Sequence, residues 1–177
     1  MQTTQPTPQT GIRRYGLLVS SLSGVLILLA LWASLHGPAE AASARAPAVE
    51  PGDVVINEVA WMGTAANDWD EWIELYNNTA NTITLDGWTI SFADGSPSTI
   101  TLSGQIGPYG YFLLERVEKA VNDISADLVY GGLRMSNISE TLTLRDNLGQ
   151  VIDTVNADGG DWPAGNNNPD HSMERIN

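Results

Sequence analysis

The stretch from Val54 to Phe92, VVINEVAWMGTAANDWDEWIELYNNTANTITLDGWTISF, constrains the fold more than any other part of the chain. Val54–Val59 is a β-branched run of strand length, and Trp72–Tyr76 alternates aromatic, aliphatic and acidic residues. The pairs Asn77-Asn78 and Asp86-Gly87 are turn-forming residues placed between such runs. The stretch therefore predicts the first half of an all-β sandwich.

The rest of the chain continues this pattern, with short apolar runs about every 8–12 residues and Gly, Asn, Asp or Pro between them. Pro108–Gly110 and Asp146–Gly149 are expected to form turns, the second as a tight hairpin loop. After residue 36, only Arg116–Asn122 has the composition for a helical turn. The nine predicted strands are Val54–Trp61, Glu71–Asn77, Thr82–Leu85, Trp88–Phe92, Thr99–Leu102, Tyr111–Glu115, Asp127–Tyr130, Thr141–Arg145 and Val151–Val155.

The N-terminal region predicts export. Residues 1–15 are polar and end near Arg13-Arg14, and residues 16–36 contain no Asp, Glu, Lys or Arg. A helix of about 20 such residues reaches roughly 30 Å, enough to cross a bilayer core. The segment is either a membrane anchor or a secretory signal cut near Ala41–Ala44, where small residues alternate. In both cases the basic end stays in the cytoplasm, residues 37–52 form an Ala/Pro-rich linker, and the domain at 53–177 lies outside.

Composition narrows the classes of partner. From Glu50 onward the chain has 20 Asp and Glu residues against five Lys and Arg residues, a formal charge of −15. Nucleic acid is therefore excluded as a partner, because its binding depends on Lys and Arg at the phosphates. Cations, basic proteins and neutral sugars are compatible with such a surface. The chain has no cysteine, so it has neither a disulfide framework nor a thiolate zinc site.

The residues for common catalytic sites are missing. His36 lies in the apolar segment, and His171 is the one histidine after it, in a tail rich in Gly and Asn. A single histidine without cysteine cannot fill a tetrahedral zinc shell, and it offers little to a nucleophilic triad. We expect His171 to be a solvated loop residue.

Two oxygen-rich stretches are candidates for calcium, which binds several carboxylate and carbonyl oxygens in flexible loops. One precedes the second predicted strand and the other follows the last predicted strand. Their spacing does not match an EF-hand, and Asp and Gly are also ordinary turn residues. If the two stretches converge, the metal ligands are Asp68, Asp70, Asp158 and Asp161.

Three glutamates, Glu58, Glu71 and Glu74, lie within the strongest strand motifs. A pair of carboxylates can hydrolyse glycosidic bonds, but acids on largely apolar strands are expected to pair with a cation because burying them alone is costly. We predict that Met173–Ile176 docks on the body of the domain, with Met173 and Ile176 as its apolar anchors. Arg175 within it is then expected to pair with one of the three glutamates.

The tryptophans divide into two groups. Trp72 and Trp88 are most simply core residues of a sandwich. Trp61, Trp69 and Trp162 fall at strand ends or in loops, where a ring either packs locally or stacks on a sugar or a protein.

Six motifs follow one another along the chain: VVINEVAW, DEWIELYN, ITLDGWTI, GPYGYFLLER, ISETLTLRDNLGQVID and SMERI. In this order they resemble the lamin-tail domain in its bacterial secreted or membrane-anchored form. The resemblance covers about Asp53–Ile176 and implies an all-β, immunoglobulin-like sandwich of about eight or nine strands, here preceded by one N-terminal hydrophobic helix. The filament-forming coiled coil of animal lamins is absent, so filament assembly is not implied.

The expected function is that of a non-enzymatic extracellular or cell-envelope module, for binding or structural interaction with a protein or surface polymer. Its membrane contact is the N-terminal segment if that segment is not cleaved. The alternative is an accessory carbohydrate-binding module, with or without calcium. A glycoside hydrolase is the third alternative. The non-enzymatic module, the first of these functions, requires no cofactor.

Overall fold

The computed structural model describes residues 48–93 and 99–176, which lie in one compact unit, Pro47–Asn177. The predicted segments 1–15 and 16–36, and most of the predicted linker, fall outside the described residues. Among the described residues, no helix has the length and apolar character to cross a membrane. The last residues of the predicted linker belong to the domain, because Val49 packs against the hydrophobic core.

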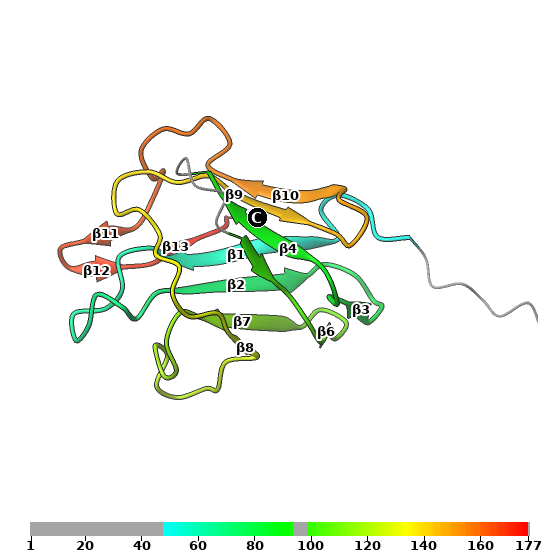
Figure 1. The fold of residues 1–177 in the computed structure, drawn as a ribbon, viewed down its shortest axis with the longest axis horizontal. Coiled ribbons are helices and arrows are strands. Elements are labelled where there is room, and N and C mark those ends of the chain that lie inside the picture. Colours follow the sequence, from blue (N-terminus) through cyan, green and yellow to red (C-terminus); the bar gives the residue numbers. More distant parts are fainter. Residues whose placement is uncertain (1–47, 94–98, 177) are drawn as a thin grey trace, which may run out of the picture. The chain divides into compact units, whose positions relative to one another are not determined.

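The larger sheet has five strands, mostly antiparallel, with β7 and β8 parallel (Figure 1). Its central strands are the ones that the sequence indicates most strongly. In spatial order the strands are β13 (Met173–Glu174), β1 (Val54–Ala60), β2 (Trp72–Asn77), β7 (Tyr111–Glu115) and β8 (Leu128–Val129).

The second large sheet has four antiparallel strands, and two strand pairs complete the domain. The four-stranded sheet has the order β10 (Val151–Val155), β9 (Leu142–Arg145), β4 (Thr89–Phe92) and β5 (Thr99–Thr101). The pairs are β3 (Ile83–Thr84) with β6 (Gln105–Ile106), and β11 (Asn166–Asn167) with β12 (Asp170–His171).

The core lies between the two large sheets. Every second residue of β2 and β4 is buried, which is the period expected when one face of a strand packs inward. Ile73 and Leu75 of one sheet and Ile90, Leu142 and Leu144 of the other are fully buried in one cluster. This packing of two antiparallel sheets is the predicted all-β sandwich.

All nine predicted strands are present, with ends that differ by at most one residue. The sequence did not indicate β6, β11, β12 or β13, each of which has two residues. The hairpin at Asp146–Gly149 is confirmed, because the Gly149 N–H donates to the Asp146 carbonyl at 3.1 Å. The prediction of a helical turn at Arg116–Asn122 is wrong, because this segment forms irregular turns. The Glu115 carboxylate holds these turns by accepting hydrogen bonds from the Lys119 and Val121 N–H groups.

The chain enters the domain at one end of the sandwich. The Gly52 N–H donates to the Ile152 carbonyl at 2.9 Å, beside the beginning of β10. The β11–β12 pair lies at the opposite end (Figure 1). The chain entry and the β11–β12 pair therefore lie at opposite ends of the domain.

Candidate functional site

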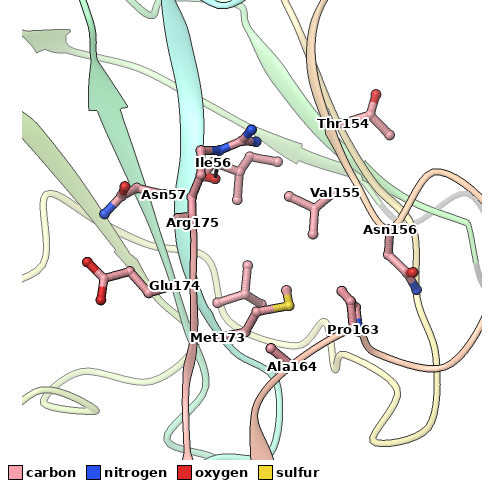
Figure 2. A pocket seen from close by; sticks show the side chains of 11 residues that line it. Ile56, Asn57, Thr154, Val155, Asn156, Pro163, Ala164, Met173, Glu174 and Arg175 are labelled. Atoms are coloured by element: carbon pink, nitrogen blue, oxygen red, sulfur yellow. Dashed lines mark hydrogen bonds between the residues drawn. The ribbon is translucent and has the colours of Figure 1, made fainter. Parts of the chain in front are cut away.

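A pocket of about 300 Å³ opens at the side of the sandwich, between the edge strands β10 and β13 of the two large sheets. Ile56, Val155 and Met173 face it from three different segments (Figure 2). Its polar rim comprises Asn57, Thr154, Asn156, Glu174 and Arg175. Its apolar lining comprises Ile56, Val59, Val155, Pro163, Ala164 and Met173.

Two β-bulges shape the strands around this pocket. The register of β1 with β2 shifts between Ile56 and Glu58, so Asn57 is an extra residue. The register of β10 with β9 shifts between Val151 and Asp153, so Ile152 is an extra residue there. A bulge bends its strand and redirects the neighbouring side chains. The second bulge brings the Asp153 carboxylate to β1.

Asp153 and Arg175 complete the hydrogen bonding of β1 beyond the end of β13. The Ile56 N–H donates to Asp153 Oδ2 at 2.8 Å, and Arg175 Nε donates to the Ile56 carbonyl at 3.2 Å. Arg175 Nη2 lies 2.6 Å from the same Asp153 oxygen. The side-chain pair therefore does for Ile56 what a neighbouring strand would do.

These contacts confirm one prediction about the tail and correct another. The tail docks, because β13 pairs with β1 and Met173 is buried. Ile176 is not an apolar anchor, since its exposed fraction is 95%. The expected pairing of Arg175 with Glu58, Glu71 or Glu74 is wrong: its ion pair is with Asp153, which the bulge in β10 brings within reach.

Glu71 is paired instead with Arg116. Both side chains are buried, and Arg116 Nη1 lies 3.1 Å from Glu71 Oε1. The Met135 N–H donates to Glu71 Oε2 at 3.0 Å, and Arg134 Nε lies 3.7 Å from Oε1. The Glu71 carboxylate thus connects the start of β2 to the end of β7 and to the chain before β9.

Burial raises the pKa values of two groups in the cluster around Glu71. Desolvation raises the pKa of Glu71 to about 7, although the Met135 N–H and the charges of Arg116 and Arg134 oppose the shift. Burial also raises the pKa of the Tyr130 hydroxyl, and the charge of Glu71 adds to that effect. Among the described residues, neither the Tyr130 hydroxyl nor Arg116 Nε has a hydrogen-bond partner.

Glu58 and Glu74 lie in one row of the sheet with Glu174. Glu58 is directly opposite Glu174 on one side and Glu74 on the other. Ser172 Oγ donates to Glu58, and Asn57 Nδ2 donates to Glu74 Oε1 at 2.9 Å. Burial raises the pKa of Glu74, as do the charges of Glu58 and Glu174. None of the three glutamates considered for glycoside hydrolysis lines the pocket.

The four predicted calcium ligands do not form a site in the part of the chain that the structure describes. Those residues contain no group of three or more His, Asp or Glu side chains able to hold a metal ion. Asp70 accepts from Thr64 Oγ1 at 2.8 Å and from Asn67 Nδ2 at 3.0 Å, within its own loop. Asp158 accepts from the Gly160 N–H at 3.2 Å, and Asp68 and Asp161 are exposed.

The three candidate stacking tryptophans have different surroundings. Trp61 and Trp162 stack on each other, with centroids 6.0 Å apart and planes 3° from parallel. Trp61 is buried, which agrees with the alternative of local packing; its Nε1 donates to the Ala164 carbonyl at 3.2 Å. Trp69 is 55% exposed, and the Arg116 guanidinium lies 4.1 Å from the centroid of its ring.

The fold and this site define an immunoglobulin-like β-sandwich module, with a pocket at the open side between its sheets. Comparison with protein families agrees: the model of the Lamin Tail Domain family matches residues 47–159. The chain belongs to the lamin tail domain family, a family of non-enzymatic binding or structural domains. No curated protein matches the chain.

The match ends before the segment that closes the pocket. Pro163, Ala164 and β13 follow residue 159. Sequence reasoning found the docking of the tail but missed the pocket and the roles of Asp153 and Arg116. The role of Asp153 could have been inferred from its position in the apolar run VIDTV, because a carboxylate in such a run requires a partner.

Proposed function

We propose that this protein is a non-enzymatic binding module of the cell envelope or the extracellular space. The uncharged segment 16–36 either anchors it in a membrane or is removed as a signal.

The pocket between β10 and β13 is the observation that carries the binding function. A C-terminal segment beyond the family match folds back and forms one wall of it. The lining is aliphatic, which suits an apolar side chain of a protein partner better than a sugar. None of the candidate catalytic glutamates reaches it.

A carbohydrate-binding module is the second candidate, and a separate observation favours it. Tyr76 and Tyr111 lie opposite each other on the outer face of the five-stranded sheet, with ring centroids 4.9 Å apart and planes inclined by 40°. Tyr111 is 60% exposed, so its ring is available for stacking.

Cell fractionation tests the location. We expect either a full-length product in the membrane fraction or a soluble product outside the cytoplasm that begins near Ala42–Arg45. Soluble full-length chain in the cytoplasm would contradict the proposal.

Binding assays of the purified full chain against peptide and glycan arrays test the function. We expect peptide binding that Ala164→Phe reduces and Tyr111→Ala leaves unchanged, because Ala164 lines the pocket and Tyr111 does not. Glycan binding that responds to Tyr111→Ala supports the second candidate. If neither array gives binding, the binding function is wrong.

A further inference from the structure

We propose that the pocket receives an aliphatic side chain from an extended, basic peptide that adds as a strand to the free edge of β10. This inference rests on the proposed binding function and names the class of ligand. It requires a free strand edge, a cavity of suitable size and lining, and a complementary charge.

The outer edge of β10 is free along its second half. β10 is the outermost strand of its sheet, with β9 on its other side. Near its start, the Ile152 carbonyl accepts from Gly52, and Asp153 contacts β1 through its side chain. Beyond Asp153, Thr154 and Val155 are partly exposed, and no strand of the described residues pairs with that edge.

The free part of β10 lacks the sequence features that prevent an edge strand from pairing with a further strand. Natural edge strands avoid further pairing through lysine, proline, bulges or a covering segment. In VIDTV the bulge at Ile152 and the charged Asp153 both lie before the free part, and the strand contains neither lysine nor proline. Thr154 and Val155 are β-branched residues, which favour a strand conformation.

The pocket lies beside this free edge and has room for an aliphatic side chain. Val155 contributes to its aliphatic lining, together with Ile56 and Met173 from the opposite side (Figure 2). Its volume of about 300 Å³ is at the lower end of the roughly 300–1,000 Å³ of small-molecule sites. In strand addition, backbone hydrogen bonds provide affinity and pockets for alternate side chains provide specificity.

Contacts within the domain hold the walls of the pocket in place. β13 is paired with β1, and the Trp61–Trp162 stack fixes the chain next to Pro163 and Ala164. A preformed site avoids the entropic cost of ordering its walls on binding.

Charge favours a basic peptide. The connection between the lining residues Asn156 and Pro163 carries the exposed Asp158 and Asp161. Arg175, the cationic residue of the rim, is already paired with Asp153. With 20 acidic and five basic residues from Glu50 onward, the domain attracts Lys and Arg beside the aliphatic anchor.

The test begins with a displayed library of nine-residue peptides selected on the purified full chain, followed by synthesis of a selected peptide. We expect an aliphatic anchor flanked by Lys or Arg. Replacing the anchor by alanine should weaken binding about tenfold to a hundredfold, because one buried aliphatic side chain is lost. N-methylation at alternate residues should weaken binding at least about tenfold, while N-methylation at the intervening residues should have little effect.

Two matched variants locate the binding. Ala164→Phe adds a ring to the lining of the pocket and should remove binding, whereas Ala157→Phe places the same side chain at a nearby exposed position that does not line the pocket and should not. A thermal melt shows whether each variant is folded. If Ala164→Phe does not fold, the N-methyl series on the unaltered protein decides the question.

The outcomes separate this inference from the function on which it rests. Binding that Ala164→Phe removes but that shows no alternation with N-methylation overturns strand addition and leaves the binding function intact. Binding that a folded Ala164→Phe variant retains overturns the pocket as the site. Self-association of the chain through this edge, measured as a pocket-dependent dimer, overturns the peptide ligand. Absence of any peptide or glycan binding overturns both proposals.

Discussion

The Asp153 carboxylate and the Arg175 guanidinium meet at 2.6 Å and together satisfy both backbone groups of Ile56. Asp153 accepts the Ile56 N–H, and Arg175 donates to the Ile56 carbonyl. Residues about 100 positions or more from Ile56 therefore replace a strand at the point where β13 stops pairing. The pair joins the edges of both sheets, and its Arg175 belongs to the polar rim of the pocket.

The two members of this pair are expected to contribute unequally to stability. Asp153→Ala leaves the buried Ile56 N–H without its acceptor, which typically costs about 1–3 kcal/mol. Arg175→Ala should cost about 1 kcal/mol, because the Arg175 side chain is 34% exposed and partly exposed ion pairs contribute little. Urea denaturation of both variants checks the order. Arg145→Ala, which removes an exposed donor to the Gly149 carbonyl, is the control and should have a smaller effect than either.

The pH dependence of stability provides a test of Glu71. Its pKa is about 7 in the folded protein against 4.5 for the free side chain, so between these values the native state binds more protons than the unfolded state. The contribution of Glu71 is therefore most favourable below pH 4.5 and is lost as the pH rises through about 7. The loss amounts to about 3 kcal/mol at most, since one pKa unit corresponds to about 1.4 kcal/mol.

Glu71→Gln should remove this dependence. The free energy of unfolding, measured in urea between about pH 4.5 and 8, should fall less steeply with pH in the variant than in the unaltered protein. Glu118→Gln changes an exposed glutamate and should keep the original slope. Equal slopes for the Glu71 variant and the unaltered protein would show that Glu71 does not titrate in this range.

The strands that form the core were predictable from sequence, whereas the partners of the charged residues were not. Ile73 and Leu75 alternate with polar residues, so the local pattern fixes which face is buried. The pairing of Arg175 depends instead on an extra residue at Ile152 in a distant strand. A bulge changes the direction of side chains without a clear pattern in the sequence, so sequence reasoning chose the wrong carboxylate.

The short strands show the same limitation. β11, β12 and β13 have two residues each, too few for a hydrophobic period. Met173 was identified as an anchor because an apolar residue in a polar tail is conspicuous. The pocket was not predictable, since its lining comes from segments up to about 120 residues apart in the chain.

The two arginines beside Glu71 should differ sharply in their effect on stability. Arg116 is buried at 3% exposure, so Arg116→Ala leaves the Glu71 carboxylate buried without its principal partner, a change that typically costs about 3–5 kcal/mol. Arg134 is 55% exposed and more distant, so Arg134→Ala should cost less than about 1 kcal/mol. Denaturation at pH 8 distinguishes them, because Glu71 is then largely ionised. Similar losses in both variants would contradict the assignment of Arg116 as the main partner.

Gly165 and Gly149 provide a matched pair for testing the contact that holds the C-terminal segment. Both have a φ of 85°, where any other residue is strained, but a Cβ at Gly149 meets open space. At Gly165 it would lie 2.7 Å from Trp61 Nε1 and 3.0 Å from the His171 carbonyl oxygen. Gly149→Ala should therefore cost about 1–2 kcal/mol from backbone strain alone.

Gly165→Ala should cost about 1–3 kcal/mol more than Gly149→Ala, because the added methyl group displaces Trp61 from its stack on Trp162. Urea denaturation measures the difference, and tryptophan fluorescence of the native variants shows whether the stacked rings have moved. Peptide binding at the pocket should weaken in Gly165→Ala and not in Gly149→Ala, since Gly165 follows the lining residue Ala164. Equal stability of the two variants would mean that the segment after residue 160 is not held by the Trp61 contact.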